Sequence, residues 1–160
     1  MPDFGQLRDF AERYTAAWCS GNASSVAAFY SWNASLTINA DAPAQGREAI
    51  AMAAQSFMTA FPDLQVFMDD IEMQGDRAVY HWTLSGTNTG PGGTGQPVRI
   101  RGYEVWTIAE DGRIAESQGH FDSADYQRQL QRSVTKIWRE RSAQQKRLVE
   151  QKTRGGQDYP

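Results

Sequence analysis

Three segments in the second half of the chain decide the fold: Ala78–Ser85 reads AVYHWTLS, Val98–Ile108 reads VRIRGYEVWTI, and Arg113–Phe121 reads RIAESQGHF. Each alternates polar and apolar residues with a period of about two, which predicts β-strands. Glu110-Asp111-Gly112 separates the last two segments and is a strong turn signal, and Gln74-Gly75-Asp76 stands before the first. The sequence therefore predicts antiparallel strands joined by hairpins.

The first half of the chain is mainly helical. Apolar residues recur at helical spacing over residues 4–19 and predict an amphipathic helix. We expect a short second helix over about 24–31, a short strand over Ser35–Asn39, a third helix from Gly46 to about Ala60 and a strand over Leu64–Met73. Helices that are segregated from a mainly antiparallel sheet define an α+β fold.

Length and composition indicate one domain without a membrane segment. The chain has 160 residues, of which 40% are hydrophobic, and no apolar run approaches the ~20 residues that cross a bilayer. No signal peptide is visible at the N-terminus. Cys19 is the only cysteine, so an intrachain disulfide is excluded and a reducing, cytoplasmic location is expected.

The charge is distributed unevenly between the body of the chain and its tail. Residues 1–127 hold 7 Arg, no Lys and 16 Asp/Glu, a net charge of −9, whereas residues 128–160 hold 9 Lys/Arg and 3 Asp/Glu, a net charge of +6. We expect a domain over 1–131 and a basic helical tail over 132–160, docked through Trp138 and frayed or disordered at its end. No nucleic-acid-binding module accompanies the basic charge, so the tail is expected to contact the acidic body or a partner subunit.

Three groups of residues together resemble a known family. The first runs from Arg13 to Asn22 and is followed by Phe29-Tyr30. The second is the run Tyr80–Gly90 with Gly102–Trp106, and the third leads from Asp111-Gly112-Arg113 to His120-Phe121-Asp122. In order and spacing they resemble the SnoaL-like branch of the nuclear-transport-factor-2-like (NTF2-like) superfamily, over about residues 5–131. Polyketide cyclases, ketosteroid isomerase and limonene-epoxide hydrolase are relatives. The resemblance implies a curved sheet wrapped around three N-terminal helices as a cone, plus a C-terminal helix.

The resemblance to ketosteroid isomerase also implies positions for catalytic residues. Tyr14 falls at the place of a tyrosine on the first helix, and Glu104 at or near that of a protonated acid on a late strand, which form the oxyanion hole of the isomerase. The general base of the isomerase has no counterpart, because its strand here reads Thr37-Ile38-Asn39 and the first carboxylate is Asp41. Steroid isomerisation is therefore not expected.

The resemblance to the epoxide hydrolase is also incomplete. Its arginine and one aspartate correspond to Val79 and His81, and a second aspartate, present in many SnoaL-like cyclases, corresponds to Gly119. A glycine there leaves room in the pocket for a larger ligand.

His81, Glu104 and Tyr14 remain as candidate catalytic residues. Side chains alternate between the two faces of a strand, so His81 lies on the same face as Val79, and Glu104 lies on the same face as Trp106. If both faces line the cone, an imidazole and a carboxylate share an apolar cavity suited to general acid–base chemistry. The alternative is a hydrogen-bonded His–Glu pair that only supports the sheet.

The pocket wall is expected to be largely aromatic, although about half of these residues are expected to belong to the core. The candidate ligand-binding residues are Trp18, Trp32, Asn39, Phe57, Phe61, Trp106, Gly119 and Phe121. The spacing of histidines, cysteine and carboxylates predicts no metal site, and no cofactor is expected. Asp122 is expected to cap the final helix. The glycine-rich loop Thr87–Pro97 is either a flap at the pocket mouth or a plain hairpin connection.

The candidate residues are compatible with two functions. The first is a cofactor-independent acid–base enzyme of cyclase, isomerase or hydrolase type that acts on a hydrophobic carbonyl-bearing molecule. In this enzyme His81 moves the proton, and Tyr14 and Glu104 hydrogen-bond the developing enolate. The second is a non-catalytic ligand-binding or assembly domain of the same fold, because the expected carboxylates are missing. The resemblance also implies a homodimer through the outer face of the sheet, where we expect Tyr80, Trp82, Tyr103 and Val105, and His120 is expected on the same side.

Overall fold

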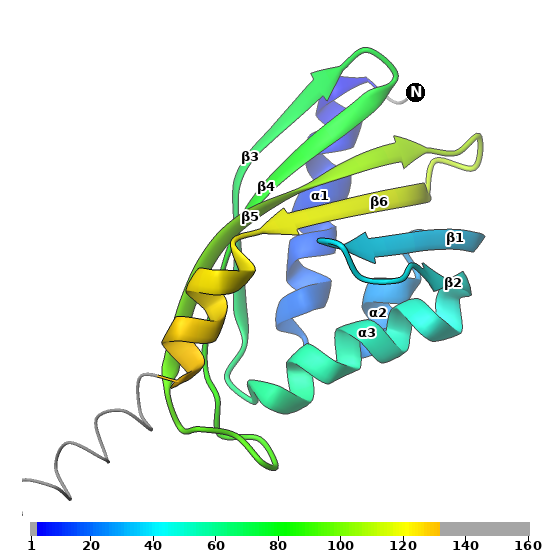
Figure 1. The fold of residues 1–160 in the computed structure, drawn as a ribbon. Helices are drawn as coiled ribbons and strands as arrows, with labels where there is room; N and C mark the ends of the chain where they lie inside the picture. The colour runs from blue at the N-terminus through cyan, green and yellow to red at the C-terminus, as the bar shows by residue number, and fades with distance from the viewer. Residues whose placement is uncertain (1–2, 132–160) are drawn as a thin grey trace, which may run out of the picture.

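The structure is a computed structural model that describes residues 3–131 (Figure 1). Its helices before the last strand are α1 (Phe4–Cys19), α2 (Ala23–Ala27) and α3 (Gly46–Ala60). Helix α1 begins at a capping box, in which the Asp3 carboxylate accepts a hydrogen bond from the Gln6 N–H at 2.8 Å. The Asn22 side chain caps α2. The predicted bounds of α1 and α3 are confirmed.

Six strands form one curved sheet. They are β1 (Tyr30–Ile38), β2 (Ala44–Gln45), β3 (Gln65–Gln74), β4 (Arg77–Thr87), β5 (Pro97–Ile108) and β6 (Ile114–Phe121). Their order is β2-β1-β6-β5-β4-β3, and every neighbouring pair is antiparallel except β1 and β6, which run parallel. The expected α+β fold with a mainly antiparallel sheet is confirmed.

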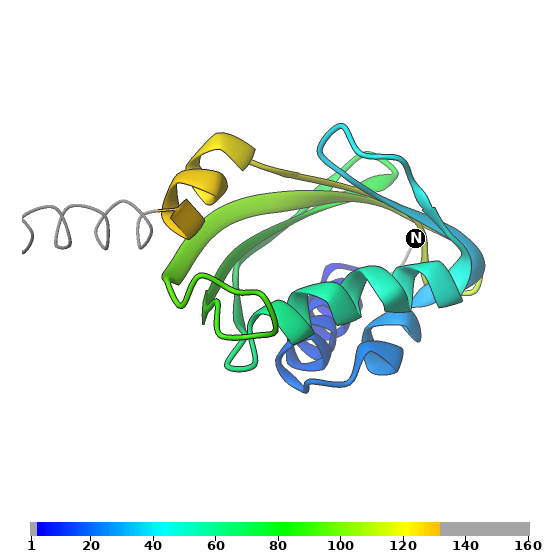
Figure 2. The same cartoon turned by 60° about the horizontal axis from the view of Figure 1, so that its bottom comes forward.

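The three N-terminal helices cover one face of the sheet. Figure 2 shows α1, α2 and α3 together on one side of the curve. Leu7 and Tyr14 of α1 and Ile50 of α3 are fully buried there, with Tyr80 and Trp106 of the sheet among the same core residues. We call this side of the sheet the inner face and the opposite side the outer face.

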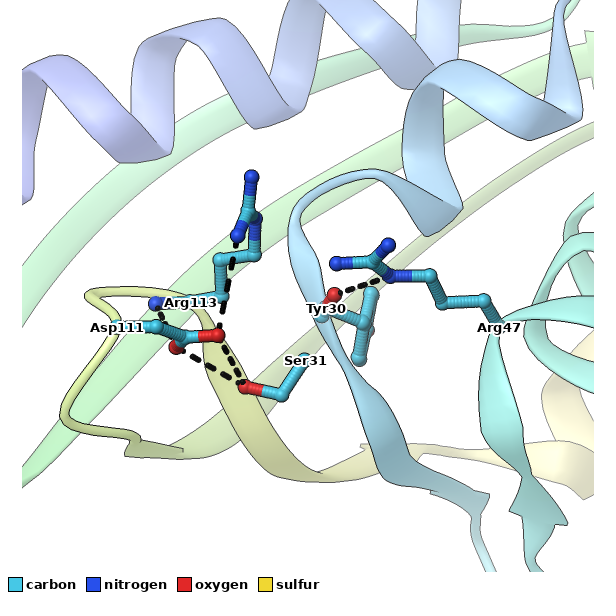
Figure 3. A network of polar contacts seen from close by, with 5 residues as sticks. All are labelled: Tyr30, Ser31, Arg47, Asp111 and Arg113. Atoms are coloured by element: carbon cyan, nitrogen blue, oxygen red, sulfur yellow. Dashed lines mark hydrogen bonds and ion pairs between the residues drawn. The ribbon is translucent and has the colours of Figure 1, made fainter.

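Strand β1 begins earlier than the sequence suggests. The second helix was expected to reach residue 31, but it ends at Ala27 and the chain is extended from Tyr30 onward. Figure 3 shows the contacts responsible: the Arg47 Nε donates to the Tyr30 carbonyl at 2.8 Å, and the Ser31 hydroxyl donates to the Asp111 carboxylate at 3.1 Å. Tertiary contacts with α3 and with the β5–β6 turn therefore override local helical preference at these two residues.

A further helix follows β6 and runs from Ser123 to the end of the described residues at Gln131. Asp122 caps it, because the Asp125 N–H donates to the Asp122 carboxylate at 3.0 Å, as expected. The side-chain amide of Gln129 pairs with the Arg99 backbone of β5, accepting at 2.7 Å and donating at 2.9 Å. The basic tail over 132–160, with its predicted docking residue Trp138, lies outside the described residues.

The glycine-rich loop between β4 and β5 closes the C-terminal end of α3. The Asn88 side-chain amide and the Gly90 N–H both donate to the Ala60 carbonyl, at 3.2 and 3.3 Å. A Cβ on Gly90 would collide with the Thr59 carbonyl, so only glycine allows this close approach. The loop is thus a hairpin connection that satisfies the end of a helix.

Candidate active site

An apolar cavity lies between the helices and the inner face of the sheet. We call it the inner chamber; its volume is about 60 Å³. Its lining residues are Trp18, Leu36, Ile38, Phe57, Val66, Tyr80, Trp82, Leu84, Ile100, Glu104, Gly119 and Phe121. Five of them are aromatic, none is basic, and Glu104 is the only carboxylate. The chamber therefore presents a single acid to an otherwise apolar ligand surface.

A larger and more polar cavity adjoins the inner chamber. We call it the vestibule; its volume is about 590 Å³, within the usual range of about 300–1,000 Å³ for ligand sites. It shares four lining residues with the inner chamber: Leu36, Ile38, Phe57 and Phe121. Its other walls include the loop Asn39–Ala42, Ser56 of α3 and Tyr126 of the last helix. A ligand can thus keep a polar portion in the vestibule and place an apolar end in the chamber.

The Glu104 carboxyl is held from behind by two hydroxyl groups. Its Oε1 accepts hydrogen bonds from the Tyr14 hydroxyl at 3.0 Å and from the Ser117 hydroxyl at 3.2 Å. Among residues 3–131, none donates a hydrogen bond to Oε2. The Trp106 indole N–H lies near the carboxyl and lowers its pKa, but it does not reach hydrogen-bond geometry. One carboxyl oxygen is therefore fixed, and the other is left for a ligand.

Burial makes Glu104 a weak acid. Desolvation raises the pKa of Glu104 from 4.5 to about 7, although the hydrogen bonds from Tyr14 and Ser117 oppose the change. The pKa of Tyr14 lies well above its ordinary value, first because of burial and then because of the Glu104 charge. Tyr14 stays a neutral donor, whereas Glu104 has both of its protonation states accessible near neutral pH.

A second tyrosine holds the first in place. The Tyr14 and Tyr30 hydroxyls lie 2.8 Å apart, and both side chains are fully buried. The backbone of Tyr30 is itself fixed by Arg47, and its neighbour Ser31 by Asp111 (Figure 3). The orientation of the Glu104 carboxyl thus rests on contacts from α1, α3, β1 and the β5–β6 turn.

His81 does not reach the inner chamber. Tyr80 is paired with Glu104 across β4 and β5, and His81 is paired with Tyr103, so the His81 side chain points to the outer face. There its Nε2 lies 3.6 Å from the Glu72 carboxylate, with the side chain 38% exposed. The expectation that His81 and Glu104 share a cavity is wrong, and the alternative, a hydrogen-bonded His81–Glu104 pair, is wrong as well.

The structure divides the expected ligand-binding residues into three groups. Trp18, Phe57, Gly119 and Phe121 line the inner chamber, and Asn39 lines the vestibule. Phe61 and Trp106 are fully buried core residues that line neither cavity. Trp32 is 77% exposed, so its expected place in the pocket wall is wrong.

Besides aliphatic wall residues, sequence reasoning missed four residues that line the chamber or orient Glu104. Tyr80 and Trp82 were expected on the outer face but line the inner chamber, and Tyr30 and Ser117 were not predicted at all. A signal for the first two was present: every second residue from Ala78 to Leu84 is apolar, while three of the four residues that alternate with them, His81, Thr83 and Ser85, are polar, with Val79 as the exception. His120 does face outward, with its ring tilted against that of Tyr103 and the ring centroids 4.9 Å apart.

The described residues offer neither a metal cluster nor a membrane-spanning helix. Within the part of the chain that the structure describes, no three His, Cys, Asp or Glu side chains are grouped as metal ligands. Among the helices of residues 3–131, none is both long and apolar enough to cross a bilayer.

Comparison with known proteins identifies the family. The sequence pattern of the SnoaL-like polyketide cyclases matches residues 8–130. The chain belongs to this family. No curated protein sequence matches the chain significantly.

Solved structures share the fold of this SnoaL-like chain at low sequence identity. TsrD from Streptomyces laurentii is 23% identical, with a TM-score of 0.70, over 81% of this chain and 98% of TsrD. The epoxide hydrolase/cyclase-like enzyme SalBIII, described with pyran ring formation in salinomycin, is 17% identical, with a TM-score of 0.68, over 78% and 97% of the two chains. A ketosteroid isomerase-like protein from Catenulispora acidiphila, in complex with trimethylamine, is 15% identical, with a TM-score of 0.67, over 76% and 92%.

At these identities the structural likeness shows the fold alone, which is NTF2-like. The family match indicates a small-molecule-processing domain with this fold.

Proposed function

We propose that this protein is a cofactor-independent acid–base catalyst that acts on a hydrophobic, carbonyl-bearing small molecule, with Glu104 as the proton-transferring group. The observation that carries the proposal is the Glu104 carboxyl in an apolar chamber, with Oε1 fixed by Tyr14 and Ser117 and Oε2 without a donor among the described residues. Glu104 replaces His81 in this role, because His81 lies on the outer face.

The chemistry needs only one group with two accessible protonation states. The Glu104 carboxylate removes a proton from the carbon next to the ligand carbonyl, which leaves an enolate and a protonated carboxyl. The same carboxyl returns a proton to that carbon or to another atom of the ligand, and the carboxylate is restored. A pKa of about 7 suits both steps, since a general base works best when its pKa is near the working pH.

Tyr14 and Tyr30 are positioning residues in this mechanism. Both are fully buried behind Glu104, and neither lines the inner chamber. The Tyr14 hydroxyl donates to the carboxyl and so favours its charged form. The role expected of Tyr14, a direct hydrogen bond to an enolate, is replaced by action through Glu104.

Proton exchange on a simple ketone tests the proposal without knowledge of the natural substrate. 2-Methylcyclohexanone is incubated with the protein in D₂O, and loss of the signals of the protons next to the carbonyl is followed by NMR. We expect the wild-type protein to accelerate exchange, with a rate that rises as pH increases through about 7 and then levels off. Glu104→Gln is expected to reduce the exchange to the rate in buffer.

Glu72→Gln is the matched control, because it makes the same chemical change on the outer face, where the Glu72 side chain is 45% exposed. It is expected to leave exchange unchanged. Equal rates in the wild-type protein and Glu104→Gln would reject Glu104 as the proton-transferring group.

A non-catalytic binding domain is the second candidate. Glu104 is the only carboxylate in the chamber wall, and no histidine accompanies it, which favours binding without a second catalytic group. This function predicts that ketones bind to the wild-type protein and to Glu104→Gln, while no exchange is detected in either. Exchange in the wild-type protein alone would reject it.

A homodimer through the outer face is also part of the proposal. Phe67 and Tyr103 lie on this face and are 46% and 40% exposed, and the Tyr103 ring lies close to the rings of His81 and His120. Exposed aromatic side chains are enriched in protein interfaces. Light scattering is expected to give the mass of a dimer for the wild-type protein and of a monomer for Tyr103→Glu; a monomeric wild-type protein would contradict this arrangement.

A further inference from the structure

Gly119 is a wall residue of the inner chamber that neither its backbone nor its packing requires to be glycine. It is paired with Glu104 across β5 and β6, so both residues face the chamber. Its φ angle is not positive. A Cβ built on it would lie 3.5 Å from the Thr37 carbonyl oxygen and 3.8 Å from the Glu104 Cγ, which are ordinary contacts. The backbone at this position therefore accepts a Cβ without strain.

Gly102 shows the opposite case on the neighbouring strand. A Cβ there would collide with the Trp82 ring and with the His120 carbonyl oxygen. Gly102 is therefore required for Trp82 to keep its place in the chamber wall. Gly102 is thus needed for packing, whereas Gly119 only leaves space.

The backbone at Gly119 is held firmly, so flexibility does not explain the glycine. Its carbonyl accepts from the Asn39 N–H at 2.8 Å, and the Asn39 side chain accepts from the Phe121 N–H at 2.9 Å. These hydrogen bonds involve no side chain at position 119, so they do not require a glycine there. The remaining effect of the glycine is empty space next to the Glu104 carboxyl.

That space is a large part of a small cavity. A volume of about 60 Å³ has room for about four to six water molecules. A methyl group placed in contact with the Glu104 side chain takes up much of this volume. The group that a ligand brings to the carboxyl is therefore limited in width by the residue at 119.

We propose that Gly119 determines specificity: it admits ligands whose carbonyl carbon is flanked by a ring or a branched carbon, which occupies the space beside Glu104. Among the residues that the structure describes, none in the walls of the inner chamber or of the vestibule is basic. We therefore expect this part of the ligand to carry no negative charge. The inference rests on the proposed function in naming a carbonyl compound, but its test measures binding and needs no catalysis.

Two ketones of equal carbon number test it. 2-Methylcyclohexanone has a ring and a branch beside its carbonyl, whereas 2-heptanone is linear. Their dissociation constants are measured by NMR titration of the wild-type protein and Gly119→Ala. We expect Gly119→Ala to weaken 2-methylcyclohexanone binding at least tenfold and to change 2-heptanone binding less than threefold.

Gly5→Ala is the control, because it adds the same methyl group to an exposed residue of α1, where the new Cβ would also make only an ordinary contact. It is expected to change neither constant. Equal effects of Gly119→Ala on the two ketones, no effect on either, or no binding by the wild-type protein would overturn the inference. An unfolded Gly119→Ala protein would contradict the contacts on which it rests.

The proposed function and this inference can fail separately. Size-dependent binding without proton exchange would leave Gly119 as the specificity residue of a binding domain. Exchange that depends on Glu104 but is indifferent to Gly119→Ala would leave the catalyst and reject the inference.

Discussion

Glu104→Gln removes the ionisable group from the inner chamber and keeps its shape. The new side chain retains a carbonyl oxygen that can accept the hydrogen bonds of Tyr14 and Ser117. The variant therefore isolates the free-energy cost of a buried charge from the packing of the side chain.

The direction in which stability changes with pH follows from the raised pKa of Glu104. In the unfolded chain Glu104 ionises near 4.5, and in the folded protein near 7, so the folded state holds its proton more tightly. The contribution of Glu104 to the free energy of unfolding consequently decreases as pH rises from about 4.5 to about 7 and is constant above that range. The pKa differs by about 2.5 between the two states, and each pKa unit corresponds to about 1.36 kcal/mol, so the contribution amounts to roughly 3 kcal/mol.

Urea denaturation between pH 4.5 and 8.5, followed by circular dichroism, measures this contribution. The stability of Glu104→Gln minus that of the wild-type protein should increase by roughly 3 kcal/mol over this range. Subtraction removes the groups common to both proteins, such as Asp63 and Asp111, whose pKa values are lowered mainly by backbone hydrogen bonds. A difference that does not vary with pH would refute the buried, weakly acidic carboxyl.

Three other substitutions test individual contacts. Tyr14→Phe removes a donor to Glu104, so the pKa of Glu104 should rise in an NMR titration, and about 1–2 kcal/mol of stability should be lost in urea denaturation. His81→Ala should leave the midpoint of the exchange rate against pH unchanged, because His81 lies on the outer face; a shifted midpoint would contradict its placement. Gly102→Ala should lower the melting temperature, since the new methyl group displaces Trp82, and unchanged melting would show that the wall is loosely packed.

The strands were predictable from local sequence, but the face to which each side chain points was predicted only in part. The alternation and turn signals of the second half predicted nearly correct bounds for β4, β5 and β6. Alternation states only that Glu104 and Trp106 share a face; it does not state which residues of β4 lie opposite them. The register pairs Tyr80, not His81, with Glu104, and this one-residue difference moves the histidine out of the site.

Tyr30 was missed for a different reason. Local sequence favoured a helix up to residue 31, whereas Arg47 and Asp111, distant in sequence, hold this segment extended. No local pattern contains such contacts. Tyr14 and Glu104 were found through a family resemblance that implied their positions, and the structure adds that Tyr14 contacts the carboxyl from behind.

The most direct test of the proposed catalyst is the pKa of Glu104 itself. The wild-type protein, labelled with ¹³C at the glutamate carboxyl carbons, is titrated by NMR, and the Glu104 signal is assigned by its absence from the spectrum of Glu104→Gln. We predict a midpoint near 7 for this carboxyl, well above the ordinary glutamate value of 4.5. A midpoint below about 5 for Glu104 would contradict the proposed mechanism, since the group would then be an ordinary, solvated carboxylate.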